Sequence, residues 1–344
     1  MHVLRGFSSF NRGASMMKFE LALRGGVEYR FDPLTGEQTR INPARARRFK
    51  QAQSDVEREG IIERSRNACV FCPERIGQHT PTFPETICRE GRIRRGETVV
   101  FPSLNPFGEN HAVATLSEAH YLDLDEFRVD LLRDNLLASR EYILSVWNNS
   151  RGARWPIWIW NYMPPSAGSI VHPHVQILVE GQPVPQLEEL MKRGQSYFDG
   201  RRRNYWEDLV SEEKKLGERY IFGDDALAAL ASFAPRGFNE MQFIFHRSSL
   251  SELTEGEIDG FAHAISDALC GYKAMGVGSF NLLTYSGPLN EKIDSYSLHA
   301  RLFSRPSPRG VYTNDTGPME RGYDVWVIDT VPEELAQRMK PFFS

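Results

Sequence analysis

The sequence of 344 residues contains no apolar run of about 18 residues, the length that a helix needs to cross a bilayer. Its opening residues, Met1 to Gly6, lack the apolar core of a signal peptide, so we expect a cytoplasmic protein. Neither sign of charge dominates, because 41 lysines and arginines stand against 45 aspartates and glutamates. This balance argues against a protein that mainly coats nucleic acid or an anionic membrane, and we expect neither as a partner.

Cysteine is scarce, with four residues in the chain, and this number does not indicate a disulfide framework in a reducing compartment. Several common signatures are also missing: the Gly-x-x-x-x-Gly-Lys phosphate loop, Gly-x-Gly-x-x-Gly, Gly-x-Ser-x-Gly and His-Glu-x-x-His. A substrate that carries phosphates must therefore be held by other groups. Candidates are the arginines of the segment 45–48 and the turn 166–169, although arginine clusters more often form solvated faces.

The sequence does contain one order of elements twice, namely strand, helix, strand, turn and strand. In the first half these elements are expected at residues 99–115, 123–146, 155–161 and 171–179. In the second half they are expected at residues 241–245, 254–269, 280–285 and 296–303, where Thr254 and Glu257 form a capping box. We interpret the pattern as an internal duplication in an α+β chain with antiparallel sheets and flanking helices. Coincidence in a mixed fold is the alternative.

The run His172-Pro173-His174-Val175-Gln176 is the strongest local signal. In a strand, alternate side chains share a face, so His172, His174 and Gln176 would line one side of it. Pro173 lacks a backbone donor and predicts a strand at an edge or a bulge, where a ligand can approach. A solvated polar face is the alternative.

Cys69 and Cys72 form a Cys-x-x-Cys pair, for which a zinc site, a redox pair and chance remain open. Because no second such pair exists, zinc would need two histidines to complete a tetrahedral shell. A redox pair is expected between a strand and a helix of a parallel unit, and residues 64–68 are a poor strand.

The segment from Asn161 to Gln176 resembles the active-site segment of galactose-1-phosphate uridylyltransferases, the transferase branch of the histidine triad superfamily. That family has an Asn eleven positions, and a Ser three positions, before the first histidine of His-Pro-His-x-Gln, and Asn161 and Ser169 match them. Residues 31–36 and 42–48 look like its N-terminal signature, and residues 322–324, Gly-Tyr-Asp, resemble its Gly-Tyr-Glu.

The resemblance implies a role for each matching residue. Structural zinc would be held by Cys69, Cys72, His120 and His172, His174 would be the catalytic nucleophile, and Gln176 would donate to a phosphate oxygen. The implied substrate-binding residues are Arg45, Arg48, Ser103, Asn105, Asn161, Ser169, Tyr323 and Asp324. A homodimer, in which the partner completes the sugar site, is implied as well.

The resemblance also implies a division of the chain: an N-terminal extension at 1–30, a first histidine-triad-like half with zinc and nucleophile at 31–185, and a degenerate second half at 186–344. In that second half Leu298-His299-Ala300-Arg301 replaces the family's Leu-His-x-His, so we do not expect the second metal site of some members.

Together these features predict a nucleotidyltransferase that passes a nucleoside monophosphate from a nucleoside diphosphate sugar, through a nucleotidyl-histidine, to a phosphorylated acceptor. One alternative is an ADP-sugar or dinucleoside polyphosphate phosphorylase that uses inorganic phosphate. Another is a nucleotide-binding zinc protein without catalysis. The sequence leaves the base and the sugar open.

Overall fold

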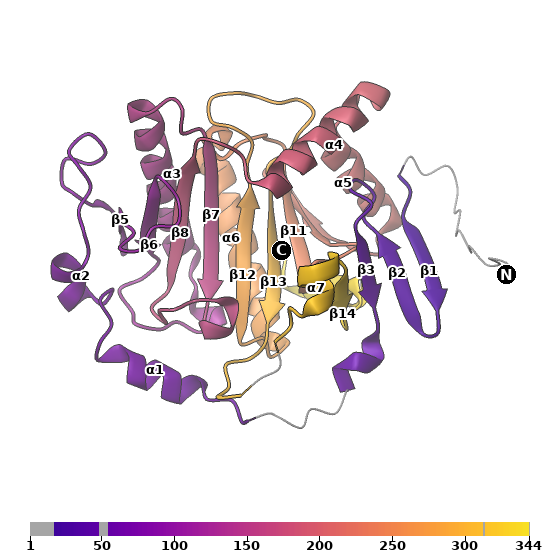
Figure 1. Ribbon diagram of the computed structural model, residues 1–344, viewed down its shortest axis with the longest axis horizontal. Helices are drawn as coiled ribbons and strands as arrows, with labels where there is room; N and C mark the ends of the chain where they lie inside the picture. Colours follow the sequence, from indigo (N-terminus) through magenta and orange to yellow (C-terminus); the bar gives the residue numbers. More distant parts are fainter. Residues whose placement is uncertain (1–16, 48–53, 312–313, 344) are drawn as a thin grey trace.

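A ten-stranded antiparallel sheet forms the centre of the computed structural model (Figure 1), which describes residues 17–47, 54–311 and 314–343. The strand order is β4-β5-β6-β8-β7-β12-β13-β11-β10-β9. The first five are β4 (Ile93–Arg95), β5 (Thr98–Pro102), β6 (His111–Thr115), β7 (Trp155–Tyr162) and β8 (His174–Glu180). The others are β9 (Tyr220–Gly223), β10 (Leu227–Ala231), β11 (Phe238–Phe245), β12 (Ser279–Tyr285) and β13 (His299–Arg305).

The order of the sheet is that of two similar halves joined at β7 and β12. Strands β4, β5, β6, β8 and β7 run inward from one edge, and β9, β10, β11, β13 and β12 run inward from the other. Each half adds one long helix between its third and fourth strands in the sequence, α3 (Val129–Asn149) and α6 (Glu255–Ala274). The predicted duplicated α+β fold is thereby confirmed.

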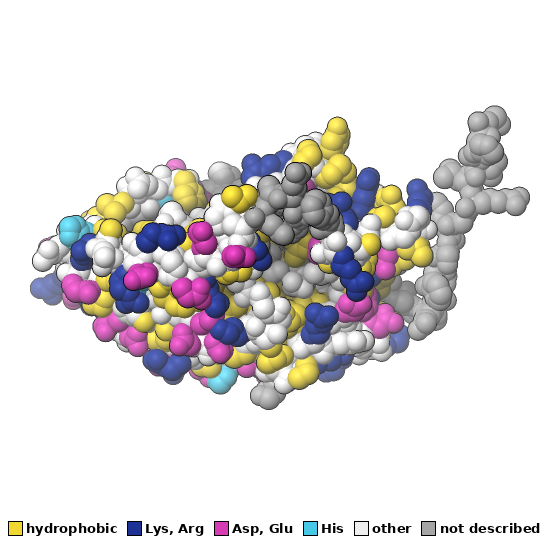
Figure 2. Space-filling view, turned by 90° about the horizontal axis from the view of Figure 1, so that it is seen from below, with side chains coloured by type: hydrophobic (Ala, Val, Ile, Leu, Met, Phe, Trp, Pro, Cys, Tyr) yellow, Lys and Arg dark blue, Asp and Glu magenta, His cyan; other side chains and the backbone are white. Residues whose placement is uncertain are grey.

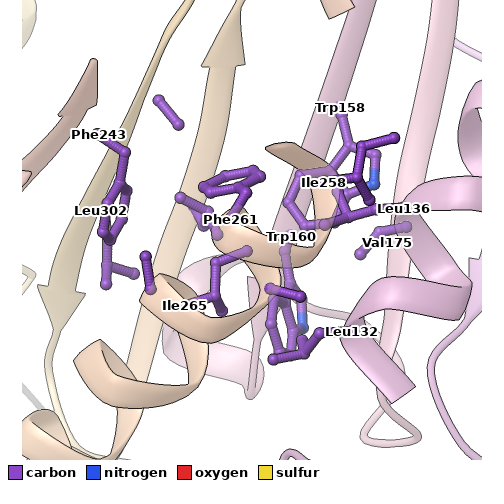
Figure 3. Packing of buried hydrophobic residues seen from close by; sticks show 14 of the residues in the cluster. Leu132, Leu136, Trp158, Trp160, Val175, Phe243, Ile258, Phe261, Ile265 and Leu302 are labelled. Carbon is purple, nitrogen blue, oxygen red and sulfur yellow. The ribbon is translucent and has the colours of Figure 1, made fainter. Parts of the chain in front are cut away.

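Both long helices pack on one face of the sheet, which we call the back face, and they form the main core with it (Figure 3). Trp158 and Trp160 alternate with partly exposed neighbours along β7, as the period of two in a strand requires. They meet Leu132 and Leu136 of α3, and Phe261 belongs to the same cluster from α6.

The start of each long helix follows from its capping residues. Thr254 Oγ accepts from the Glu257 N–H, and Glu257 accepts from the Thr254 N–H, which confirms the predicted capping box. In the first half the predicted helix, 123–146, starts too early. Asp123 caps only a short 3-10 turn, Leu124–Glu126, and α3 begins at Val129.

The opposite face, the front face, is covered in the second half by a small sheet and helices (Figure 1). The small sheet contains β1 (Glu20–Arg24), β2 (Val27–Phe31), β3 (Gln38–Ile41) and β14 (Trp326–Ile328), and β14 runs parallel to β3. The helices there are α4 (Pro185–Arg201), α5 (Tyr205–Leu216) and α7 (Pro318–Tyr323). The remaining helices are α1 (Arg58–Arg66), α2 (Pro73–His79) and α8 (Pro332–Met339).

The expected extension at residues 1–30 lies partly outside the described residues, and its described part, from Met17 on, contains β1 and most of β2. The expected division between residues 185 and 186 falls at the start of α4. These domain boundaries stay a prediction.

The molecular surface agrees with the balanced composition. Figure 2 shows basic and acidic side chains interspersed on one face rather than gathered into a field of one sign. Within the described residues, none of the helices has both the length and the apolar character that spanning a membrane requires.

Candidate metal centre and active site

Four buried side chains from separate segments meet beside the N-terminus of α2. Cys69 lies in the turn after α1, Cys72 caps α2, His120 follows β6, and His172 precedes β8. One ligand atom from each residue lies within 4.8 Å of the other three. Cys72 Sγ is 3.4 Å from Nδ1 of His120 and 3.8 Å from Nδ1 of His172. Two thiols and two imidazoles at such distances fit a closed tetrahedral zinc shell.

The hydrogen bonds around the two histidines leave their ligating nitrogens free of protons. His172 Nε2 donates to the Ser117 carbonyl over 2.8 Å, so its Nδ1 carries a lone pair toward Cys72. His120 Nε2 lies 2.9 Å from Ser65 Oγ, whose own proton goes to the Ile62 carbonyl. His120 therefore also donates through Nε2 and presents Nδ1, which is the tautomer that such partners impose on metal-binding histidines.

Burial shifts the ionisation of this cluster. It raises the pKa of the Cys72 thiol to about 11, with a further contribution from Cys69, and it lowers the pKa of His172 to about 4. Neutral imidazoles suit metal ligation, while the thiols must release their protons when a metal binds. The donor set thus fits zinc, and the redox interpretation of the Cys pair lacks the expected strand before it.

The predicted position of His172 and Pro173 is wrong in two respects. Strand β8 begins at His174, so His172 does not share its face, and its ring turns toward Cys72 instead. Strand β8 is also an inner strand, paired with β6 and β7, rather than an edge. Pro173 is tolerated because it precedes the strand, and its carbonyl accepts from the Leu116 N–H over 2.9 Å.

His174 and Gln176 share the front face with Ile159 and Asn161 of β7, since Ile159 pairs with Gln176 and alternate residues share a face. His174 Nδ1 donates to the His172 carbonyl over 2.8 Å, which leaves a lone pair on Nε2. Burial lowers the pKa of His174, so the imidazole is neutral. The arrangement presents a neutral, oriented imidazole on the same face of the strand as an amide.

Gln176 is itself oriented by a residue that the sequence analysis missed. The Phe107 N–H donates to His111 Nδ1 over 3.3 Å, so the proton of this ring is on Nε2. His111 Nε2 then donates to Gln176 Oε1 over 3.0 Å, and the Gln176 amide N–H groups remain for another acceptor. His111 lies two residues before Val113 on β6, and Val113 pairs with Gln176. This alternation is the signal from which His111 could have been predicted on the face of Gln176.

The turn between β7 and β8 contains two non-glycine residues with left-handed backbone, Met163 with φ 68° and Ala167 with φ 70°. Such strain concentrates at functional sites. Asn281 of β12 holds this turn, because its Nδ2 donates to the Ser166 carbonyl over 2.9 Å and to Asn161 Oδ1 over 2.6 Å. Ser169 is exposed on the same turn.

The other expected substrate residues lie on other segments of the chain. Ser103 and Asn105 lie on the loop from β5 to His111. Arg45 is exposed in the 3-10 turn after β3, Tyr323 ends α7 with 74% of its surface exposed, and Asp324 follows it. Among the described residues no hydrogen bond or ion pair joins these three to His174. Arg48 lies outside the described residues.

The second half has a counterpart of His174. His299 begins β13 as His174 begins β8, and its Nδ1 donates to the carbonyl two residues earlier, of Ser297, over 3.0 Å. Its ring, however, is fully buried, with stacked contacts to Trp206 at 5.4 Å and to Tyr285 at 4.9 Å between centroids. Within the described residues its Nε2 has no hydrogen-bond partner.

This geometry can be compared with known proteins. An ADP-glucose phosphorylase from Arabidopsis thaliana, solved with bound ADP-glucose, matches with a TM-score of 0.72 at 17% identity over 91% of this chain and 98% of that one. A uridylyltransferase structure matches with a TM-score of 0.66 at 22% identity, over 91% and 98% of the two chains. The chain has the galactose-1-phosphate uridylyltransferase-like fold. The resemblance stated from the sequence is thus confirmed at the level of the fold.

In sequence, a curated protein from Archaeoglobus fulgidus, described only as uncharacterized, is 29% identical over 320 residues, which are 92% of this chain and 93% of that protein. No family model matches the chain. The structural similarity therefore extends over nearly the whole fold. A proposal on function has to rest on the residues of the site.

Proposed function

We propose that the protein is a nucleotidyltransferase in which His174 is the nucleophile. Its Nε2 attacks the α-phosphorus of a nucleoside diphosphate sugar, an N–P bond forms, and the bond to the departing sugar 1-phosphate breaks. The oxygen of a phosphorylated acceptor then attacks the same phosphorus and frees the imidazole. The observation that carries the proposal is the His174 ring, held by Nδ1 on the His172 carbonyl with Nε2 available beside Gln176.

Gln176 stabilises the crowded phosphorus. With Oε1 engaged by His111, its amide N–H groups can donate to a non-bridging oxygen, where negative charge gathers in the transition state. Asn161 lies on β7, and Ser169 lies on the turn between β7 and β8. Both would contact the phosphates or the sugar. Arg45 and Arg48 would add positive charge near the phosphates.

Zinc held by Cys69, Cys72, His120 and His172 would fix the segment before β8, and its closed four-ligand shell would leave no position for substrate. The metal would therefore contribute to stability and to the position of the His172 carbonyl, on which His174 depends.

A homodimer is part of the proposal. Tyr323 and Asp324 resemble sugar-binding residues of the family, yet they are exposed, and within the described residues no hydrogen bond or ion pair joins them to His174 of their own chain. Sedimentation analysis, with Tyr323→Ala as the variant, tests this assignment.

A phosphorylase that uses inorganic phosphate as acceptor is the second candidate. It is favoured by the structural match to ADP-glucose phosphorylase. Both candidates share the nucleotidyl-histidine and differ in the group that removes it.

The test is intact-protein mass spectrometry after incubation with UDP-glucose, ADP-glucose or GDP-mannose. We expect one donor to add the mass of one nucleoside monophosphate, which maps to the peptide containing His174. His174→Asn should lose the adduct, and His263→Asn, a change at an exposed histidine, should keep it. Chasing the adduct with inorganic phosphate or glucose 1-phosphate separates the two candidates. Tight nucleotide binding without an adduct would refute the proposal and favour a non-catalytic nucleotide-binding protein.

A further inference from the structure

A cavity of about 280 Å³ lies on the front face of the second half, away from His174. Its floor is the front face of β12 and β13, with Tyr285, Arg301 and Phe303, and its rim includes Trp326 of β14 and Thr316. Three strand steps separate β8 from β13, which is about 14 Å at the usual strand spacing. The cavity therefore lies on the same face of the sheet as His174 and is displaced from it toward the second half.

Arg301 is the central polar group of this cavity. Its side chain is 9% exposed, and its Nη1 reaches Glu240 Oε1 only at 3.4 Å, which is long for a hydrogen bond. Among the described residues the buried Arg301 Nε has no hydrogen-bond partner. Five donor hydrogens on a buried guanidinium with one weak acceptor leave a strong demand for acceptor oxygens.

A second arginine of the lining has the same deficit. Arg236 Nε is buried without a hydrogen-bond partner among the described residues, and its nearest carboxylate, on Glu37, is 3.8 Å away. Of the nine buried side-chain atoms left unpaired in the described part of the chain, two therefore belong to arginines whose side chains line this one cavity.

The carboxylates of the lining are already engaged. Asp315 binds Arg305 through both oxygens at 2.7 Å, and Glu320 accepts from the Gly317 and Val327 N–H groups. Glu240 accepts from Ser232 Oγ at 2.6 Å and from the Arg236 N–H at 2.7 Å. Each of these carboxylates is thus held in place by partners other than Arg301 Nε and Arg236 Nε.

The rest of the lining is apolar and aromatic. Tyr285, Phe303, Trp326 and Phe238 are each partly buried and border the cavity, and the Arg301 guanidinium lies 5.7 Å from the centroid of the Tyr285 ring. Aromatic faces around a small cavity suit a planar ring, and guanidinium groups suit the oxygens of a carboxylate or a phosphate.

We propose that this cavity binds a small aromatic oxyanion, that is, a carboxylate or a phosphate carried on a planar ring. The oxyanion would accept from the Nη groups of the Arg301 and Arg236 guanidiniums, and the ring would lie among Tyr285, Phe303 and Trp326. This inference is independent of the proposed nucleotidyl transfer.

Isothermal titration of the full chain tests the proposal with four probes: phenyl phosphate and benzoate, which combine a ring and an oxyanion, and inorganic phosphate and phenol, which have one feature each. We expect one ring-oxyanion per chain to bind at least tenfold more tightly than phosphate or phenol. Whether phenyl phosphate or benzoate binds better identifies the oxyanion. Equal binding of all four probes, or no binding of either ring-oxyanion, would overturn the proposal.

Three variants place the binding in this cavity. Arg301→Met should weaken the preferred probe at least tenfold, and Thr316→Trp should close the cavity without touching an ion pair. Arg247→Met, a matched change at a half-exposed arginine outside the lining, should bind as the wild type does. If Arg301→Met does not fold, Thr316→Trp decides. Wild-type affinity in the folded variants of the cavity would place the probe elsewhere and overturn the proposal.

Discussion

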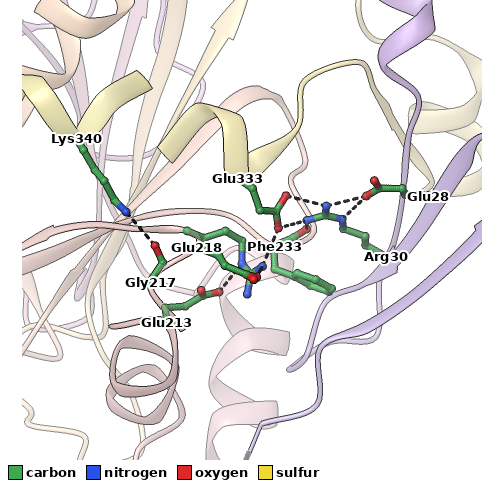
Figure 4. A network of polar contacts seen from close by, with 9 residues as sticks. Glu28, Arg30, Glu213, Gly217, Glu218, Phe233, Glu333 and Lys340 are labelled. Carbon is green, nitrogen blue, oxygen red and sulfur yellow. Dashed lines mark hydrogen bonds and ion pairs between the residues drawn. The ribbon is translucent and has the colours of Figure 1, made fainter. Parts of the chain in front are cut away.

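Replacing Glu333 by Gln should destabilise the protein, because this carboxylate joins the small sheet to the large one. Glu333 lies in the first turn of α8, and its two oxygens accept from Nη1 and Nη2 of Arg30 on β2, each over 2.9 Å. One oxygen also accepts from Arg219 Nη1 over 2.7 Å. Figure 4 shows Glu333 between Arg30 and Glu213. Both arginines are almost fully buried. Glu28 is the other carboxylate partner of Arg30, and Glu213 and Glu218 are those of Arg219.

The magnitude follows from the ionisation of Glu333. Burial by itself would raise its pKa, but the hydrogen bonds and charges of Arg30 and Arg219 outweigh burial and lower the pKa from 4.5 to about 2. At about 1.4 kcal/mol for each pH unit, the ionised side chain contributes about 3 kcal/mol at neutral pH. With an unfolding entropy of about 2.1 cal/mol/K per residue, 344 residues convert this energy into a melting shift of roughly 4 °C.

The sign of the pH dependence is also fixed. Because the folded pKa lies below the unfolded one, the contribution is complete above pH 4.5 and is lost as the pH falls toward 2. Calorimetric melting of the wild type and Glu333→Gln should therefore differ by roughly 4 °C at pH 7 and by about half as much at pH 3. Glu334→Gln, at the exposed neighbour in the same helical turn, is the control and should melt near the wild type. A Glu333→Gln shift no larger than the control, or one that grows on acidification, would refute this reasoning.

The remaining predictions concern the site. Cys69→Ser should lower both the melting temperature and the zinc content, which we expect to be one per chain in the wild type. Cys88→Ser is the control and should retain zinc. Metal analysis of both variants is the test, and full zinc in Cys69→Ser contradicts the assignment. His174→Asn should keep zinc and the fold while losing the nucleotide adduct, and loss of zinc there would mean that the two histidine roles are reversed. His111→Leu should lower kcat about tenfold with little change in KM, since Gln176 loses its orienting hydrogen bond; activity assays with His111→Asn, which can still donate, should show partial rescue.

The sequence was informative where a single segment carries the signal. Alternation along residues 155–161, the Thr254–Glu257 capping box and the repeated order of elements predicted strands, a helix start and the duplicated sheet. The four metal-ligand candidates came from the family resemblance, and the structure brings all four together. Each of these features depends on local pattern or on a recognisable motif.

Features that depend on pairing between distant segments were missed. His111 acquires its role only because β6 pairs with β8. Ser65 of α1 and Ser117 of the loop after β6 each lie 55 residues from the histidine that they orient. Pro173 was misinterpreted for a related reason. A proline is excluded from an inner strand only where its N–H would have to donate to a neighbouring strand. Pro173 stands one residue before β8 begins, so no such hydrogen bond is lost.

The comparison of His174 with His299 shows what distinguishes the two halves chemically. Both imidazoles donate through Nδ1 to the carbonyl two residues earlier, so both have their lone pair on Nε2. A nucleophile also needs room for phosphorus within bonding reach, and around His299 the rings of Trp206 and Tyr285 are packed against the imidazole. At the position of Gln176, moreover, the second half has Arg301, which faces Glu240. The second half therefore retains the backbone geometry of the proposed nucleophile, while Trp206 of α5 and Tyr285 cover the ring of His299.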